Sequence, residues 1–319
     1  MPEPAAERVL VHVGYHRTGT SWLQKNLFAN AGAGFGWVGK KQPDHPVRQV
    51  ISLPWSEFDA GALRARFDAL TDPIRAERRV PVVSFERLSG HAASGGYDSA
   101  QIAERLRAVF PEARVLIVMR EQRSAILSNY RMYVKAGGTA TLRDFVLPAT
   151  TPNRRFPTFD FRFFEYHRLL ERYRQLFGPS SVLGLLYEQF VAEPRAYVAA
   201  IASFAGRPAA DGLLHSLPYD QSQHGSPDTA ELRALRVLNH FIRSELNPTP
   251  ALDLRRPHAL RKLARGAAAT LLTPERAARR LESSLRRELE ELVGDRYAES
   301  NRRTAELTQI EVGRYGWPV

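Results

Sequence analysis

Short hydrophobic runs alternate with longer amphipathic stretches along the first two thirds of the chain. Four runs rich in Val, Leu or Ile cover residues 8–14, 79–85, 114–119 and 181–187. Runs of this length are typical of strands that are buried on both faces of a parallel sheet. Because most of them are followed by a helical pattern, the sequence predicts an α/β fold with a parallel β-sheet flanked by helices.

Three amphipathic patterns predict helices around these strands. The first begins at Asp98, which we expect to cap the helix together with Gln101 three residues on. A stripe of apolar residues predicts a second helix over 163–177, and a third is predicted over 194–204. These helices occupy the positions that βαβ connections require.

The last third of the chain has a different pattern. From Asp228 onward the sequence is helical and rich in arginine, with breaks near 247–250 and 273–274. We expect a single domain over 1–319, with an α/β core over 1–220. Residues 221–319 then form a helical extension, a candidate lid, whose aromatic C-terminal tail is docked.

The composition is that of an ordinary globular protein of 319 residues. No apolar run reaches the roughly 18 residues of a membrane-spanning helix, and the N-terminus lacks the features of a signal peptide. The chain has no cysteine, which excludes disulfides, thiolate catalysis and cysteine-ligated metals. We therefore expect a cytoplasmic location.

The net charge of +11 favours an anionic partner, which could be nucleic acid, a membrane surface or a phosphorylated small molecule. The basic residues are almost all arginines, scattered along the chain and mixed with Glu. An ordinary solvated basic surface therefore also explains the charge.

The segment Gly14-Tyr-His-Arg-Thr-Gly-Thr-Ser-Trp22 follows the first predicted strand and opens a helix that should reach about Phe28. A glycine-bounded loop in this position binds anions with backbone N–H groups at a helix N-terminus. Its spacing imitates a Walker A loop, but Thr20 replaces the lysine and the positive charge sits at Arg17. A transferred group with less charge than a phosphoryl group, such as a sulfuryl group, suits this loop. A tight turn without a ligand is the alternative.

Residues 12–24 resemble the 5′-phosphosulfate loop of sulfotransferases that use 3′-phosphoadenosine 5′-phosphosulfate (PAPS), especially the bacterial ones. The resemblance implies that the 5′-phosphosulfate is bound by Arg17, Thr18, Gly19, Thr20 and Ser21. It also implies that Trp22 contacts the adenine ring. Arg17 stands where the family usually has lysine. Because arginine stays charged, we assign Arg17 to charge stabilisation on the bridging oxygen and the departing phosphate.

The strand over 114–119 runs into Arg120, and Ser128 follows eight residues later. In the family, an arginine and a serine at this spacing bind the 3′-phosphate. A guanidinium grips phosphate in a bidentate manner and a serine adds a hydroxyl donor. Arg123 is a reserve candidate, and an ordinary surface salt bridge is the alternative for Arg120.

Residues 181–206 resemble the strand and helix that start with Tyr-Glu-Asp in the family. Gln189 replaces the Asp, and we expect Tyr187 to be a buried structural residue. The resemblance covers most of the chain and is specific over 9–28, 114–130 and 181–206. The family's C-terminal basic loop is missing, so Arg302 and Arg303 are the candidates for closing the 3′-phosphate site.

The acceptor must lose a proton, which requires a general base near the donor sulfur. The family uses a His or a Glu near the end of the second strand, and Glu86 occupies that place. His91 and His16 are the alternatives, and Glu86 could instead form a salt bridge with Arg87. His12 alternates into the first strand and is expected to be a core residue.

These observations predict a sulfotransferase that uses PAPS, releases 3′-phosphoadenosine 5′-phosphate (PAP) and requires no metal. The acceptor is a hydroxyl or amine of a small molecule, glycan, lipid or peptide, with no nucleic-acid partner and no membrane span. We expect residues 36–60, 130–160 and 220–265 to form the acceptor site, and the arginine-rich last third would suit an acidic acceptor. A P-loop-type kinase, a basic nucleic-acid-binding protein and an inactive sulfotransferase-like protein are the alternatives. The sequence leaves the oligomeric state open.

Overall fold

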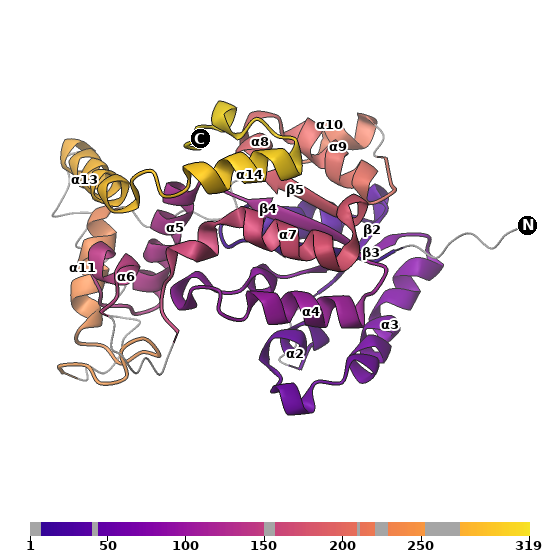
Figure 1. Ribbon diagram of the computed structural model, residues 1–319, viewed down its shortest axis with the longest axis horizontal. Coiled ribbons are helices and arrows are strands. Elements are labelled where there is room, and N and C mark those ends of the chain that lie inside the picture. Colours follow the sequence, from indigo (N-terminus) through magenta and orange to yellow (C-terminus); the bar gives the residue numbers. More distant parts are fainter. Residues whose placement is uncertain (1–7, 40–43, 150–156, 209–210, 221–228, 253–274) are drawn as a thin grey trace, which may run out of the picture.

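The computed structural model describes residues 8–39, 44–149, 157–208, 211–220, 229–252 and 275–319. Its centre is a five-stranded, all-parallel sheet with the strand order β2-β3-β1-β4-β5 (Figure 1). The strands are β1 Leu10–Gly14, β2 Phe35–Val38, β3 Val80–Ser84, β4 Arg114–Met119 and β5 Val182–Leu186. The predicted parallel α/β fold is therefore confirmed.

The edge strand β2 was not predicted from the sequence. It has only four residues, Phe-Gly-Trp-Val, and glycines interrupt and flank it. Such a segment has little strand propensity of its own. It becomes a strand because it pairs in parallel with β3, from Phe35 opposite Val80 to Val38 opposite Val83.

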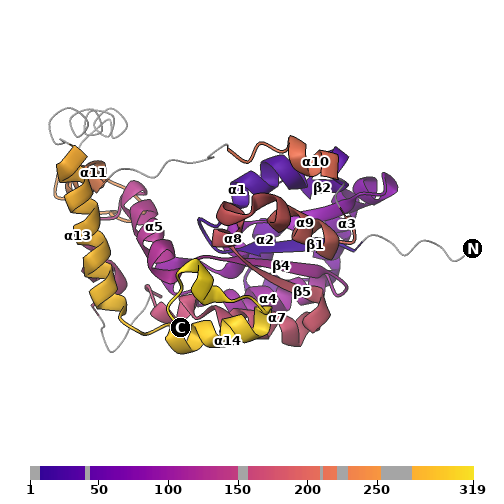
Figure 2. The same ribbon diagram turned by 90° about the horizontal axis from the view of Figure 1, so that it is seen from above.

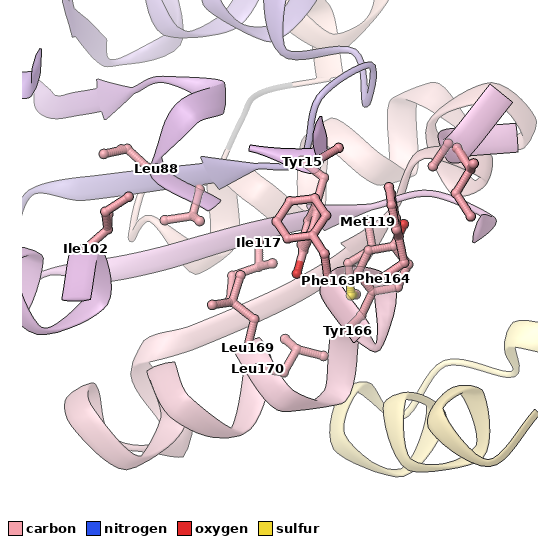
Figure 3. Packing of buried hydrophobic residues seen from close by; sticks show 14 of the residues in the cluster. Tyr15, Leu88, Ile102, Ile117, Met119, Phe163, Phe164, Tyr166, Leu169 and Leu170 are labelled. Carbon is pink, nitrogen blue, oxygen red and sulfur yellow. The ribbon is translucent and has the colours of Figure 1, made fainter. Parts of the chain in front are cut away.

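Alternate residues of the central strands face opposite sides of the sheet. In β4, Val115, Ile117 and Met119 belong to one hydrophobic cluster, whereas Leu116 and Val118 belong to the other. Helices α3, α4 and α7 contribute to the first cluster, and α9, α10 and the helical segment after β1 contribute to the second. Figure 2 shows α4 and α7 on one side of the sheet and α1, α9 and α10 on the other, and Figure 3 shows the packing in the first cluster.

The α-helices connect the strands and extend beyond them. They are α1 Thr20–Trp22, α2 Pro46–Ser52, α3 Ala60–Ala76, α4 Ser99–Val109, α5 Gln122–Lys135, α6 Leu142–Val146, α7 Tyr166–Phe177, α8 Tyr187–Ala192, α9 Pro194–Phe204, α10 Asp211–Ser216, α11 Thr229–Asn239, α13 Glu275–Val293 and α14 Ala298–Thr308. The three predicted helices correspond to α4, α7 and α9.

One predicted detail of α4 is wrong. Asp98 does precede the helix, but its carboxylate makes no capping hydrogen bond. Instead it accepts two hydrogen bonds from Arg87, at 2.5 and 3.2 Å. An ion pair with a nearby guanidinium thus replaces the cap.

The C-terminal helices pack against helices that follow the central strands. Helices α11 and α13 contact α5, and α14 lies along α7 (Figure 1). In the tail, the Trp317 ring is buried and its Nε1–H donates to Glu188 at 3.3 Å. Within the described part of the chain, no helix is both long and apolar enough to cross a membrane.

Candidate functional site

The site lies where the strand order reverses. The chain leaves β1 towards β2 and β3 on one side and later returns to the other side of β1 as β4. In open parallel sheets, such a reversal creates a crevice outside the carboxyl ends of the two strands. Gly14 ends β1 and Met119 ends β4, so the glycine-bounded loop and Arg120 both start at this crevice.

The loop after β1 has the backbone conformation of an anion-binding turn. Arg17 and Gly19 adopt left-handed conformations, with φ of 69° and 80°. The N–H groups of Trp22 and Leu23 donate to the Gly19 carbonyl oxygen at 2.9 and 3.1 Å, so that the helix begins at Thr20. It continues as a π-helical segment, Leu23–Phe28, to the predicted end. The N–H groups of its first turn are therefore available to an anion.

Two threonines of this loop have different environments. The Thr18 hydroxyl donates to the Tyr15 carbonyl oxygen at 2.6 Å and holds the loop together. The Thr20 side chain is also buried, but its Oγ1 has no hydrogen-bond partner among the described residues. Thr20, Gly19 and Ser21 line the cavity, whereas Thr18 does not. An unsatisfied buried hydroxyl at a cavity wall fits a ligand oxygen.

The loop also requires a glycine at the end of β1. A Cβ on Gly14 would lie 2.7 Å from Thr20 Oγ1 and 2.9 Å from a ring nitrogen of His12. Gly14 thus allows the Thr20 hydroxyl to sit against the strand end.

Arg17, Arg120 and Ser128 come together although more than one hundred residues separate the loop from β4. Arg17 Nε donates to Ser128 Oγ at 3.1 Å, and Arg120 Nη1 donates to the Arg17 carbonyl oxygen at 3.1 Å. Burial and the positive charge of Arg120 lower the pKa of Arg17. Two neighbouring cations at a cavity wall favour an anionic ligand, because it neutralises their mutual repulsion.

Three side chains hold Arg120 and the residue after it in place. The Tyr166 hydroxyl donates to the Arg120 carbonyl oxygen at 2.6 Å, and Glu188 accepts the Glu121 N–H at 3.0 Å. The Arg120 guanidinium lies over the Tyr187 ring, 5.0 Å from its centre. Tyr187 is only half-buried and lines the cavity, which the prediction of a buried structural tyrosine did not anticipate. Tyr166 was not singled out by any sequence motif, whereas Glu188 belongs to the segment that resembles Tyr-Glu-Asp, although the resemblance gave no role for it.

Gln189 keeps the function of a polar residue at the start of α8. Its side-chain oxygen accepts the Leu186 N–H at 2.9 Å at the end of β5. A carboxylate at this position could accept the same bond. Gln for Asp therefore preserves the local structure.

The three candidate bases line the same cavity. Glu86 is the first residue of a 3₁₀ turn, Glu86–Ser89, which follows β3, and the rings of His16 and His91 lie 5.2 Å apart. Arg87, the alternative partner of Glu86, forms its ion pair with Asp98. The carboxyl end of β3 thus brings Glu86 to the crevice, as the sequence predicted.

The hydrogen bonding of His91 limits what it can do. Its Nδ1 accepts the Ala93 N–H at 3.3 Å, and burial, with Arg87, lowers its pKa. The neutral ring in this tautomer carries its proton on Nε2, which makes Nε2 a donor rather than a base. His12, by contrast, is fully buried beside Ser84, with Nδ1 2.8 Å from the hydroxyl, as expected for a core histidine.

The cavity has a volume of about 820 Å³, which is the size of a site for a nucleotide and a second small molecule. Trp22, Phe190 and Tyr219 form one aromatic wall. The Trp22 ring stacks on Tyr219 with the centres 5.4 Å apart, and its Nε1–H donates to the Pro218 carbonyl oxygen at 3.0 Å. Contact between Trp22 and an adenine ring stays a prediction.

Two of the three segments expected to form the acceptor site contribute to the cavity. Residues 130–160 supply Met132, Tyr133, Ala136 and Phe145, and residues 220–265 supply Asp220, Glu245 and Leu246. Among the described residues, 36–60 contribute nothing to its lining.

The two candidates for closing the 3′-phosphate site lie elsewhere. Arg302 and Arg303 are on α14, where they pair with Glu299 at 2.7 Å and with Glu171 at 2.6 Å. Neither lines the cavity. Arg123, the reserve candidate, lines a separate cavity of about 290 Å³ beside Glu121.

The fold and the site define an α/β protein with a glycine-bounded loop and two neighbouring arginines at a strand switch point. Residues 98–211 match the model of the sulfotransferase family. No curated protein sequence matches the chain.

Solved sulfotransferase structures are similar over most of the chain. The sulfotransferase of Alicyclobacillus acidocaldarius is 21% identical, with 81% of this chain and 100% of that chain covered and a TM-score of 0.49. The mouse sulfotransferase SULT7A1 complexed with PAP is 14% identical, with coverages of 90% and 89% and a TM-score of 0.37. The sulfotransferase domain of the curacin biosynthetic pathway is 12% identical, with coverages of 87% and 97% and a TM-score of 0.37.

Proposed function

We propose that the protein transfers a sulfuryl group from PAPS to a hydroxyl or amine of an acceptor. The observation that carries the proposal is the meeting of Arg17 and Arg120 with the Thr20 hydroxyl at one cavity wall, where Ser128 bonds Arg17 from just outside the lining. This arrangement supplies two guanidinium groups and two hydroxyls to a ligand with two separate phosphate groups. PAPS is such a ligand.

Different residues hold the 5′-phosphate and the 3′-phosphate of the donor. Gly19, Thr20 and Ser21 hold the 5′-phosphate through N–H groups and hydroxyls of the first helical turn. Arg120 and Ser128 hold the 3′-phosphate. The Thr18 hydroxyl stays bonded to Tyr15, so that Thr18 contributes through its backbone only.

The transfer is an in-line displacement at sulfur. The acceptor oxygen or nitrogen forms a bond to sulfur while the bond from sulfur to the 5′-phosphate oxygen breaks, and PAP leaves. Arg17 stabilises the charge that develops on that oxygen, and it needs to donate no proton because phosphate is a good leaving group. Glu86 takes the acceptor proton, and His91 donates a hydrogen bond through Nε2.

Ligand binding tests the donor site directly. Calorimetry and thermal shift should show that PAP stabilises the protein more than ATP, with or without magnesium. Arg120→Ala should weaken PAP binding by about ten-fold or more, since it removes a charged hydrogen-bond donor. Arg302→Ala, which removes an arginine outside the cavity, is the matched control and should bind PAP normally.

The opposite result favours a different enzyme. Magnesium-dependent stabilisation by ATP without a response to PAP would support the kinase alternative. Equal PAP affinity in Arg120→Ala and the unmodified protein would remove Arg120 from the 3′-phosphate site.

A further inference from the structure

The part of the cavity away from the phosphate loop is mainly apolar. Helix α5 and its C-cap residue Ala136 present Asn129, Met132, Tyr133 and Ala136 on one face, with the spacing i, i+3, i+4 and i+7. Ala93, Phe145 and Leu246 complete the apolar lining, which we call the acceptor chamber together with these α5 residues. An apolar wall of this kind favours an apolar ligand.

Two apolar side chains of the acceptor chamber are exposed to solvent. Met132 and Leu246 each have 41% of their surface accessible, although both line the cavity. Leu246 belongs to a tight turn in which Ser244 and Asn247 exchange backbone hydrogen bonds of 3.0 and 3.2 Å. A ligand that covers these side chains removes apolar surface from water and is stabilised by that burial.

The same turn brings a carboxylate to the chamber. Glu245 lies between Ser244 and Leu246, and its charge raises the pKa of His91, against the larger lowering by burial. The turn is tied to α5 because Asn247 donates to the Asn239 carbonyl oxygen at 2.8 Å. Asn239 in turn donates to the Val134 carbonyl oxygen at 2.7 Å. Glu245 therefore faces the cavity from a supported position.

The described cavity lining contains more carboxylates than arginines. Among its described lining residues, the arginines are Arg17 and Arg120, both beside the phosphate loop. The described carboxylates of the lining are Glu86, Asp220 and Glu245. The described arginines of the last third of the chain lie outside this lining and give no support to the expectation of an acidic acceptor.

We propose that the acceptor is an apolar alcohol or phenol and that Glu245 makes the enzyme prefer a cationic acceptor over an anionic one of the same size. The inference rests on the proposed sulfuryl transfer. The apolar face of α5 with Leu246 selects the body of the acceptor, and Glu245 selects its charge.

Three phenols of similar size test the charge preference. Tyramine is cationic, 4-propylphenol is neutral and 3-(4-hydroxyphenyl)propionate is anionic. With PAPS as donor, kcat/KM should be highest for tyramine and lowest for the propionate. In Glu245→Gln the ratio of tyramine to propionate should fall by about ten-fold, because an attraction and a repulsion are both removed. Glu291→Gln, on the exposed surface of α13, is the control and should keep the ratio of the unmodified enzyme.

PAP binding distinguishes a failure of the acceptor assignment from a failure of the proposed function. If PAP binds but the propionate or an anionic glycan is the better acceptor, or none of the phenols is sulfated, the acceptor assignment is overturned while the donor site stands. If PAP does not bind, the proposed function itself fails. An unchanged ratio in Glu245→Gln would remove Glu245 from acceptor selection.

Discussion

Neighbouring side chains of the phosphate-binding loop have separate tasks. Thr18 and Thr20 are both buried threonines two positions apart, yet among the described residues only the Thr18 hydroxyl has a hydrogen-bond partner, the Tyr15 carbonyl oxygen. A buried hydroxyl that bonds the backbone supports the fold, whereas one without a partner at a cavity wall is poised for a ligand. The two residues form a natural pair for mutation.

Valine has the shape of threonine, so substitutions to valine distinguish the role in supporting the fold from the role in binding a ligand. We expect Thr20→Val to weaken PAP binding by about ten-fold, because a hydroxyl donor to phosphate is lost, with little change in stability. Thr18→Val should lower the free energy of unfolding by about 1–3 kcal/mol, because the Tyr15 carbonyl oxygen loses its partner. Urea denaturation and calorimetry on both variants measure the two effects. If Thr18→Val weakened PAP binding and Thr20→Val lowered stability, the roles assigned to the two threonines would be reversed.

The role of Glu86 as the base gives a second prediction at this scale. Glu86→Gln keeps the size of the side chain but cannot accept a proton, so turnover should fall by about 10²-fold or more while PAP affinity is unchanged. Steady-state kinetics measure turnover, and calorimetry measures PAP binding. Unchanged turnover would leave His16 as the remaining candidate, since Nδ1 of His91 is used by the Ala93 N–H.

The sequence identified residues of the site more reliably than it described their environment. Arg17, Arg120 and Ser128 could be found because each follows a recognisable strand at a known spacing. The roles of Tyr166 and Glu188 could not be found, because their contacts with the backbone of Arg120 and Glu121 form only in the folded chain.

At the scale of elements, continuous apolar runs were sufficient to predict the inner strands. Residues 114–119 form β4 as predicted, because a strand buried on both faces must be apolar throughout. The edge strand β2 lacks that pattern and depends on its pairing with β3. Similarly, the ion pair between Asp98 and Arg87 could not be read from a capping pattern, since the partner lies eleven residues upstream.

Helix α2 begins with an unusual cap that depends on pH. His45 is buried, and its Nδ1 accepts the Val47 N–H at 3.2 Å, which requires a neutral ring. Burial, with the charge of Arg48, lowers the pKa of His45 below its ordinary value. On acidification through about pH 6.5, the unfolded chain therefore binds this proton before the folded protein does, and stability is lost as the pH falls.

His45→Asn tests this cap. Asparagine offers a side-chain oxygen to the same N–H but does not titrate, so the loss of unfolding free energy between pH 7 and pH 5 should be smaller in the variant. One such group contributes at most about 1.4 kcal/mol per pH unit. Urea denaturation at both pH values measures the difference. Parallel losses in both proteins would assign the acid sensitivity to other groups.

At the scale of the whole molecule, the positive charge is partly neutralised by local pairing. Arg131 pairs with Glu282, Arg172 with Glu104 and Arg303 with Glu171. The net charge of the chain is nevertheless +11. Under the proposed function, such an excess attracts the anionic donor from a distance and adds to its contacts with Arg17 and Arg120.

Ionic strength should therefore change the binding of the donor and not the rate of the chemical step. Raising the salt concentration from 50 to 500 mM shortens the screening length from more than about 10 Å to a few ångströms, and we expect the KM for PAPS to rise by about ten-fold. The kcat and the KM of a neutral phenol should change by less than about two-fold, because neither depends on long-range attraction. Initial rates at varied PAPS and phenol measure these constants in the same samples.

A salt-independent KM for PAPS would mean that contacts inside the cavity account for donor binding alone. Strong competition by DNA or RNA at low salt would instead assign the excess charge to a nucleic-acid partner.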